Sequence, residues 1–594
     1  MDMLDSKKLV EDYLQRRDWR VQENSNAPFS FGALNKRLVH AVSEDYWLNE
    51  VYTPEIVEAY RAGFFHIHDL GGLTLYCCGY SLSKIISMGV RGVPNIPVSK
   101  PAKHFMSILN QISNLITIFQ NEIMGAVAFS SFDTLLAPFI RKDNLEYEEV
   151  KQHLQNFIFS INSNSRAGAE PAFSNITFDI TPPKDLAEMP AMIANQVQPF
   201  KYGELQEEMN LINRAFVELM LEGDAEGRPF AYPIPTYNIH DRFDWDNPVL
   251  EGVWTLAGKY GSPYFANFIN SDLDVTDVRS MCCRLRLDLR ELRKKTGGLF
   301  GSDDNTGSIG VVTINLPRIA YLSHDKNDFF IFLRHYMDLA KDSLEIKRAF
   351  LEEEILSRNA LPAFMEYVGT LNNHFSTIGL IGMNEMCLNA RWLGKDITHE
   401  ESLEFCKEVL NFMKEVILEY QTETEHLYNL EATPAESACY SLAMKDARQY
   451  PNIITQGHGD HRYYTNSCRI PVHLVDSITS AARIANELQP LFTGGTAEHF
   501  YLGAPISAAK AKYLIRHILE NYSIPYITLS PVNAFCPEHG FQIPPKQVHM
   551  KEAQCPICGK DMDLYQRITG YIRKVKNFNK GKIQEFEDRA QLFL

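Results

Sequence analysis

The sequence predicts an α/β fold, because long stretches of helical periodicity alternate with short apolar runs rich in β-branched residues. Apolar residues recur at helical spacing in four long segments, 147–162, 328–356, 398–420 and 507–521. Four short runs before, between and after them have strand composition, 64–67, 309–316, 378–381 and 526–529. This pattern does not distinguish an open sheet from a closed barrel.

Length and composition indicate one large body with a small appendage. The chain has 594 residues, 45% of them hydrophobic and 22% charged, which is sufficient for a large core. From Pro531 onward the chain becomes rich in Cys, Pro, Lys and Arg. We therefore expect a main body over residues 1–530 and a C-terminal unit over residues 531–594.

Charge and cysteine content restrict the compartment and the partners. The net charge of −16 is unfavourable for binding long nucleic acids, because such binding depends on neutralising phosphates. The N-terminus lacks the apolar core of a signal peptide, and no run of about 18 apolar residues could span a membrane. We expect a cytoplasmic protein that uses its eleven cysteines as thiols or metal ligands.

Two pairs of metal-ligand residues lie near the C-terminus. Cys536 and His539 form one pair, and Cys555 and Cys558 form the other, each with two residues between its members. Paired spacing of this kind wraps both sides of a tetrahedral ion, and three thiolates with one imidazole leave no open position. The segment predicts a structural zinc knuckle. A zinc ribbon that binds nucleic acid is the alternative, since the following segment is basic.

Gly570 follows the knuckle and interrupts an apolar, β-branched run. On its own, such a glycine is most simply interpreted as a turn or bulge that needs positive φ. A radical-bearing glycine is the other interpretation, because an unpaired electron at Cα is delocalised by the adjacent amide nitrogen and carbonyl. A residue without Cβ also becomes planar without steric cost.

Two vicinal cysteine pairs supply candidate redox groups, Cys77-Cys78 and Cys282-Cys283. In extended backbone, neighbouring side chains point to opposite faces, so one thiol of each pair would reach a shared site. The alternative is that they are small core residues.

Together these segments resemble the anaerobic (class III) ribonucleoside triphosphate reductases, which are glycyl-radical enzymes. The resemblance spans about Val21 to Arg589. It lies in Arg567-Ile-Thr-Gly570-Tyr571 after the knuckle, Met281-Cys-Cys-Arg284, and His66-Ile-His-Asp-Leu70 followed by Tyr76-Cys-Cys-Gly79. Further matching stretches are 22–24, 125–133, 164–179, 307–318, 433–437 and 577–589.

The resemblance implies a ten-stranded α/β barrel with a central finger loop, into which the Gly570 loop enters. It implies that Gly570 stores the radical, Cys283 becomes the thiyl that takes the 3′-hydrogen of the ribose, and Cys77 acts on the other face. If Cys282 faces the substrate instead of Cys283, this assignment fails. Glu436 is a candidate for proton transfer.

The resemblance also implies partners. A separate activase with an iron–sulfur cluster and S-adenosylmethionine would generate the radical, because this chain has no evident site for such a cofactor. The substrate would be a ribonucleoside triphosphate and the product a deoxyribonucleotide for DNA replication. A homodimer with deoxynucleotide effectors at its interface is expected.

The chain departs from the family pattern in two places. Its matching region starts about twenty residues in, so we expect no N-terminal ATP-cone. Formate-using members carry Asn before the Leu-Gly-Val-Val strand, where this chain has Ser308. A dithiol reductant of thioredoxin or glutaredoxin type is therefore favoured over formate.

Two further motifs have open interpretations. The segment Thr493-Gly494-Gly495-Thr496 is either a plain turn or a cradle of backbone N–H groups for phosphate, and the resemblance favours phosphate. His66 and His68 share one face of a predicted strand, as in metallohydrolases, although buried core histidines are the simpler interpretation. A glycyl-radical enzyme of another kind is a nearer alternative than a metallohydrolase.

Overall fold

The computed structural model describes residues 5–17, 19–22, 29–163, 165, 170–271, 278–281, 285–288, 305–542, 553–589 and 592. It confirms the α/β class, and the four segments of helical periodicity correspond to α7, α13 with the π-helical turn η5, α16 and α19. The four strand-like runs overlap β1, β11, β12 and β15. The hydrophobic periodicity thus located the main elements to within a few residues.

The helices have the following bounds: α1 (Ser6–Leu14), η1 (Trp19–Gln22), α2 (Phe31–Tyr46), η2 (Trp47–Val51), α3 (Pro54–Ala62), α4 (Leu82–Met88), α5 (Phe105–Gln120), α6 (Phe132–Asp143), α7 (Tyr147–Ile161), α8 (Lys184–Ala187), η3 (Tyr202–Glu204), α9 (Gln206–Glu222), α10 (Leu250–Lys259), α12 (Leu316–Leu322), α13 (Lys326–Phe350), η5 (Leu351–Leu356), α14 (Pro362–Tyr367), α15 (Met383–Asn389), α16 (Glu400–Thr424), α17 (Glu436–Gln449), α18 (Ile478–Leu488), η6 (Gln489–Leu491), α19 (Ala508–Asn521), η7 (Val575–Asn577) and α20 (Lys580–Asp588).

The strands have the following bounds: β1 (Phe65–Ile67), β2 (Cys77–Gly79), β3 (Val127–Phe129), β4 (Ser174–Phe178), β5 (Pro190–Ile193), β6 (Gln196–Lys201), β7 (Ile234–Ile239), β8 (Tyr264–Asn267), β9 (Val278–Met281), β10 (Leu285–Asp288), β11 (Gly307–Asn315), β12 (His374–Ile381), β13 (Leu427–Glu431), β14 (Glu498–Leu502), β15 (Tyr526–Pro531), β16 (Asn533–Cys536), β17 (Gly540–Gln542), β18 (Asp563–Arg567) and β19 (Ile572–Lys574).

Ten strands form one mixed sheet in the order β13-β12-β11-β2-β3-β4-β7-β8-β15-β14, and β1 adds to it by pairing with β11. Strands β2, β3, β4, β7 and β8 run parallel to one another. The other five run the opposite way, because β11 is antiparallel to β2 and β15 is antiparallel to β8. The sheet therefore consists of two parallel halves of five strands.

The two end strands of this order meet through the loop before β14. The Gly494 N–H donates to the Leu430 carbonyl at 2.7 Å, and the Ala432 N–H donates to the Gly495 carbonyl at 2.8 Å. A Cβ at Gly494 would lie 3.0 Å from the Leu430 carbonyl oxygen, so a glycine permits this approach. The loop thus joins the edge of β13 to the chain entering β14, and the sheet curls into the expected ten-stranded barrel.

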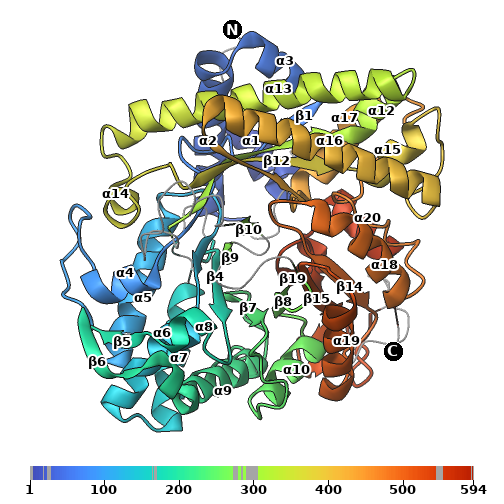
Figure 1. The fold of residues 1–594 in the computed structure, drawn as a ribbon. Coiled ribbons are helices and arrows are strands. Elements are labelled where there is room, and N and C mark those ends of the chain that lie inside the picture. Colours follow the sequence, from blue (N-terminus) through green and yellow to red (C-terminus); the bar gives the residue numbers. More distant parts are fainter. Residues whose placement is uncertain are drawn as a thin grey trace.

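Helices cover the outside of the sheet (Figure 1). Helix α13 packs on β11 and β12, α16 on β13, α6 on β4 and α10 on β15. Every residue of β11, β12, β7 and β15 is buried, which explains their nearly continuous apolar or small composition. None of the described helices is long and apolar enough to span a membrane.

Two smaller sheets pack against strands of the main sheet. Strands β9 and β10 form an antiparallel pair whose register places Met281 opposite Leu285, and β9 lies against β2 and β3. The other is the C-terminal sheet, in the order β17-β16-β18-β19. Leu564 of this sheet, together with Val575 of η7 and Phe586 of α20, shares one apolar cluster with Tyr264 and Tyr526 of the barrel.

Candidate active site

A cavity of about 460 Å³ brings together residues that lie far apart in the sequence. Cys77, Ser308, Glu436 and Gly570 all line it. They come from β2, β11, the first turn of α17 and the loop between β18 and β19. The structure therefore places four of the residues singled out from the sequence around one space.

Cys77 and Cys78 point into different environments. Cys77 lines the cavity, whereas Cys78 belongs to the main apolar core and its thiol donates to the Gly79 carbonyl at 3.4 Å. Both are fully buried. This is the alternation expected of a strand, since successive side chains leave opposite faces of the sheet.

Ser308 stands directly opposite Cys77 in the antiparallel pairing of β11 with β2. Its hydroxyl lies 2.9 Å from the Thr377 hydroxyl and donates to the Gly310 carbonyl at 3.1 Å. The pairing of β11 with β12 is irregular between Ser308 and Gly310. The Ser308 side chain therefore satisfies its hydrogen bonds within the protein.

Gly570 is buried at the turn between β18 and β19. The turn is closed by the Ile568 N–H, which donates to the Tyr571 carbonyl at 3.1 Å. The described glycines with positive φ include Gly540 and Gly559 of the knuckle but not Gly570. A need for left-handed backbone therefore does not explain the glycine at position 570.

The Gly570 carbonyl accepts two hydrogen bonds. The Arg567 guanidinium donates to it at 2.8 Å and the Tyr264 hydroxyl at 3.1 Å. Arg567 also donates to the carbonyls of Gly261 and Ser262, and its guanidinium lies 4.3 Å from the centre of the Tyr264 ring. These contacts attach the loop to β8 and the turn before it.

Helix α17 lines one side of the cavity along most of its length. Its residues Glu436, Tyr440 and Met444 line the space, at four-residue spacings that place them on one face of a helix. At its first turn, the Tyr571 hydroxyl donates to a Glu436 carboxylate oxygen at 2.7 Å. The residue after Gly570 is therefore tied directly to a carboxylate of the cavity wall.

His66 and His68 also line the cavity, and their rings are 4.6 Å apart. Burial lowers the pKa of His66 well below 6.5 and lowers that of His68 to about 4. The His68 Nε2 lies 2.8 Å from the Thr313 hydroxyl. Within the described ranges, the one group of three or more metal-type ligands is the C-terminal one, and it does not include these histidines.

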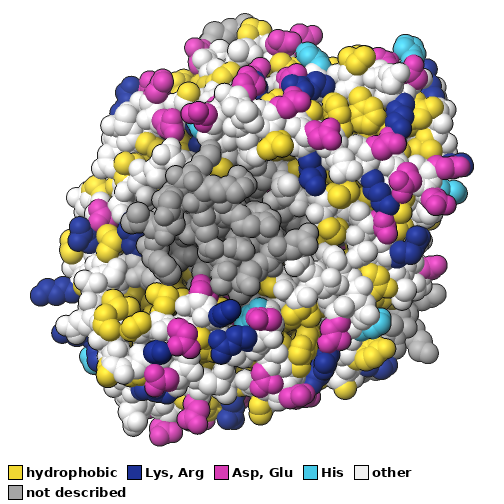
Figure 2. Space-filling view, viewed as in Figure 1, with side chains coloured by type: hydrophobic (Ala, Val, Ile, Leu, Met, Phe, Trp, Pro, Cys, Tyr) yellow, Lys and Arg dark blue, Asp and Glu magenta, His cyan; other side chains and the backbone are white. Residues whose placement is uncertain are grey.

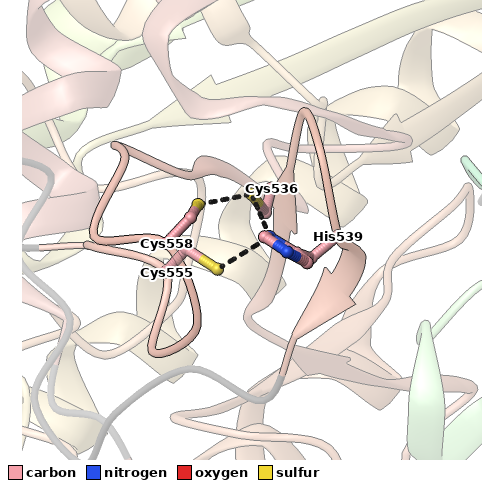
Figure 3. A group of neighbouring side chains, drawn as sticks. All are labelled: Cys536, His539, Cys555 and Cys558. Atoms are coloured by element: carbon pink, nitrogen blue, oxygen red, sulfur yellow. Dashed lines mark hydrogen bonds between the residues drawn. The ribbon is translucent and has the colours of Figure 1, made fainter.

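That C-terminal group is the predicted knuckle (Figure 3). Cys536 Sγ lies 3.6 Å from both His539 Nδ1 and Cys558 Sγ, and Cys555 Sγ lies 3.7 Å from His539 Nδ1. Tetrahedral zinc with bonds of about 2.1–2.3 Å separates its ligands by roughly 3.6–3.8 Å. Positive φ at Gly540 and Gly559 permits the turn after each pair. The four residues fit a zinc ion.

The loop Thr493–Thr496 lies at the barrel seam. Its Thr493 hydroxyl accepts from the Leu430 N–H at 2.9 Å, and the Gly494 N–H is bonded to β13 as described above. Among the described residues, those that line the cavity do not include this loop.

Several residues chosen from the sequence lie outside the described part of the chain. Cys282 and Cys283 are among them, as are residues 23–24, 164 and 166–169 of the other matching stretches. Conversely, Tyr264 and Thr377 were not found from the sequence. A single tyrosine or threonine in a buried strand carries no local signal, and only the tertiary contacts of these residues identify them.

Comparisons with known proteins give consistent results. The family model described as anaerobic ribonucleoside-triphosphate reductase matches residues 23–592. The chain is 23% identical to the protein of that name from Haemophilus influenzae over 93% of this chain and 81% of that protein. It is 21% identical to the enterobacteria phage T4 protein of that name, over 96% of this chain and 97% of that protein.

Solved structures show the same fold. A structure titled anaerobic ribonucleotide reductase superposes with a TM-score of 0.77 at 21% identity, covering 100% of this chain and 94% of that one. The Thermotoga maritima anaerobic ribonucleotide reductase with dATP in its specificity site gives 0.74 at 21% identity, covering 98% and 100%. A structure described for 1,2-propanediol dehydration in Roseburia inulinivorans gives 0.57 at 11% identity, covering 98% and 89%.

Proposed function

The chain belongs to the anaerobic ribonucleoside-triphosphate reductase family, a family of glycyl-radical enzymes, and from this membership we propose the roles of its site residues. Its activity is the radical-based reduction of ribonucleoside triphosphates to deoxyribonucleoside triphosphates. One observation carries the residue assignment: Gly570 and Cys77 line the same buried cavity.

Gly570 is proposed to store the radical and Cys283 to become the thiyl. Burial of Gly570 supports the first role, because a stored radical must be kept from solvent and oxygen. The second role is supported by the backbone on either side of residues 282–284, since β9 lies against β2, the strand that carries Cys77. Cys283 itself lies outside the described residues.

The proposed reaction conserves atoms and electrons. The thiyl sulfur takes the 3′-hydrogen of the ribose as a hydrogen atom and later returns one. Between these steps, the Cys77 thiol supplies a proton, so that the 2′-hydroxyl leaves as water. The two electrons and the two protons come from the external dithiol reductant, which ends as a disulfide and leaves the Cys77 thiol restored.

Glu436 is the proposed proton-transfer group. Its carboxylate lies on the cavity wall and is held by the Tyr571 hydroxyl at 2.7 Å. A carboxylate in hydrogen-bonding reach of the substrate could accept a proton from a ribose hydroxyl while the radical forms. The carboxylate and the radical loop are then positioned by the same contact.

A dithiol protein of thioredoxin or glutaredoxin type is the proposed reductant. Ser308 supports this, because its hydroxyl already bonds to Thr377 and the Gly310 carbonyl. It offers no amide N–H group to a small carboxylate such as formate. Turnover with formate as the sole reductant would contradict the proposal, and turnover with a dithiol alone is expected.

The zinc ion is proposed as structural, held by Cys536, His539, Cys555 and Cys558. With four protein ligands it has no position for substrate, so it supplies no chemistry to the reaction. Residues 531–594 are proposed to act as one unit that holds the radical loop, attached to the catalytic barrel of residues 1–530.

The loop Thr493–Thr496 remains the proposed phosphate cradle. The Gly494 N–H is engaged by Leu430, which leaves the N–H groups of Gly495 and Thr496 as the donors for a phosphate. The loop is hydrogen-bonded to the end of β13 across the seam and thus lies near Glu431 of the cavity wall.

Partners and assembly are proposed by the same family argument. A separate S-adenosylmethionine and [4Fe–4S] activase would form the radical, and deoxynucleotide effectors would bind at the interface of a homodimer. The Thermotoga maritima structure has dATP in its specificity site, and a second has dATP and CTP. We place the chain in the reducing cytoplasm, since none of its nine described cysteines is in a disulfide.

Anaerobic activation followed by electron paramagnetic resonance (EPR) tests the assignment. The activated enzyme is expected to show a doublet that Gly570→Ala removes. Cys283→Ser is expected to keep the doublet and to lose ribonucleotide reduction. A doublet that persists in Gly570→Ala, or full turnover in Cys283→Ser, would contradict it.

A further inference from the structure

The two donors on the Gly570 carbonyl differ in origin. Arg567 is three residues before Gly570 and donates from within the same loop at 2.8 Å. Tyr264 lies 306 residues away, on β8, and donates at 3.1 Å. Both side chains are buried, with exposed fractions of 2% and 0%. The loop's own backbone bond, from Ile568 to Tyr571, needs neither donor.

The hydroxyl proton of Tyr264 has one direction left to point. Its oxygen accepts from the Arg567 guanidinium at 2.8 Å and lies 3.4 Å from His499 Nε2. His499 Nδ1 is 3.1 Å from the Arg469 guanidinium, which only donates, so Nδ1 accepts and Nε2 carries the proton of a neutral ring. With both lone pairs facing donors, the Tyr264 proton is directed to the Gly570 carbonyl.

Hydrogen bonds to this carbonyl affect a radical at Cα. The unpaired electron is shared between the amide nitrogen, which donates density, and the carbonyl, which withdraws it. A donor on the carbonyl oxygen makes that group a stronger acceptor and therefore spreads the spin further. A charged guanidinium does so strongly, and exclusion of water from the site increases the effect.

We propose that Arg567 and Tyr264 are positioning residues that set the energy of the Gly570 radical through its carbonyl. They would thereby set the balance of one exchange, in which a thiyl sulfur takes the hydrogen atom of Gly570 Cα and leaves a thiol and a glycyl radical. One hydrogen atom moves and no charge is transferred. This inference rests on the proposed storage of the radical at Gly570.

Tyr264→Phe is the direct test, because it removes the hydroxyl and keeps the ring beneath Arg567. Without this donor, more spin stays on Cα, so the α-proton splitting of the EPR doublet is expected to widen. The stored radical is also less stabilised, so exchange of the Gly570 α-hydrogen with deuterated solvent is expected to accelerate about two- to tenfold. A purely structural role would change neither quantity.

Tyr237→Phe is the matched control. Tyr237 is fully buried on the neighbouring strand β7, and its hydroxyl has no partner among the described residues. In the Tyr237→Phe variant, the α-proton splitting and the exchange rate of the Gly570 α-hydrogen are expected to equal those of the wild type. If Tyr264→Phe also matches the wild type in both measurements, the inference is wrong.

A second measurement needs no variant. Wild-type enzyme labelled with ¹⁵N in the arginine guanidinium is activated, and pulsed EPR is used to look for ¹⁵N coupled to the radical. Coupling is expected at the distance of the Arg567 contact, and its absence would overturn the role of Arg567. If the wild type gives no doublet at all, radical storage at Gly570 fails instead, so the two failures are distinguishable.

Discussion

Cys77 and Cys78 are neighbours in the chain whose thiols lie in different surroundings, one on the cavity and one in the apolar core. Cys77→Ala is expected to lower turnover by about three orders of magnitude or more, since its thiol is the only one among the described residues that line the cavity. Cys78→Ala should retain most of the activity, with only a small loss of packing. Turnover assays of both activated variants, with the EPR doublet as a check on activation, make this comparison.

Equal losses of turnover in the two variants would show that the strand rather than the thiol matters. Retained turnover in Cys77→Ala would remove Cys77 from the reaction altogether.

His374 couples protein stability to pH. It is fully buried at the start of β12, and neither ring nitrogen has a partner among the described residues. Burial, together with a smaller effect of the Arg348 charge, lowers its pKa to about 3. Because the folded pKa is below the unfolded value of about 6.5, the unfolded chain takes up a proton first as pH falls. Stability is therefore present above pH 6.5 and lost progressively toward pH 3.

Between pH 7 and pH 5 this group should cost about 2 kcal/mol of unfolding free energy. His374→Leu is expected to reduce the acid-induced loss by about that amount, as measured by urea denaturation at both pH values. The control His324→Leu replaces an exposed imidazole and should leave the loss unchanged. A His374→Leu variant with the wild-type pH dependence would refute the coupling.

At the residue scale, local motifs predicted which residues come together. Paired ligand spacing predicted the knuckle, whose four ligands the structure brings together, whereas the radical role of Gly570 came from the family resemblance and stays a prediction. Tyr264 was not predictable, because its role depends on a contact across 306 residues. The hydrogen bond between Tyr571 and Glu436 was equally unpredictable, although both residues lie in segments that match the family.

At the scale of elements, the C-terminal sheet connects the knuckle to the radical loop. Strand β16 ends at the ligand Cys536 and pairs with β18, whose last residue, Arg567, holds the Gly570 carbonyl. A shift of β16 would therefore be transmitted to the loop through two strands. Zinc binding and radical storage are expected to depend on each other for this reason.

Cys555→Ser tests that dependence. The wild type is expected to hold one zinc per chain, and the variant to lose it, because three ligands bind the ion far more weakly. The yield of glycyl radical per chain should then fall as the sheet loosens. Metal analysis and quantitative EPR on the same samples give both quantities.

Two controls accompany this variant. His66→Ala, in the cavity, and Cys406→Ala, in the main core, should keep their zinc. Loss of zinc without loss of radical yield would separate the knuckle from the loop and contradict the proposed link.

At the scale of the whole molecule, periodicity predicted the α/β class and the main helices, whereas the closure of the barrel came only from the family resemblance. Short strands such as β2 and β3 have three residues each, too few for a periodic signal. The reversal of direction between β11 and β2 is a property of long-range pairing. No local pattern in the sequence encodes that pairing.

The charge of the whole molecule bears on the nucleic-acid alternative, which the basic segment after the knuckle had left open. In the fold, these basic groups have acidic partners: Lys574 and Lys576 share Asp563, Lys580 pairs with Asp460, and Lys582 with Glu585. Among the described residues on the face shown in Figure 2, basic and acidic side chains are interspersed.

We therefore expect no stable binding to DNA or RNA at about 150 mM salt. A protein that binds through phosphates must displace counterions with a continuous set of free cations, and a chain of net charge −16 repels the polyanion instead. Fluorescence anisotropy of labelled duplex and single-stranded oligonucleotides, measured from low to moderate salt, tests this expectation. Zinc-loaded wild type and zinc-free Cys555→Ser should both give flat titrations at moderate salt. Micromolar binding that weakens steeply with salt and disappears with the zinc would restore the zinc-ribbon interpretation.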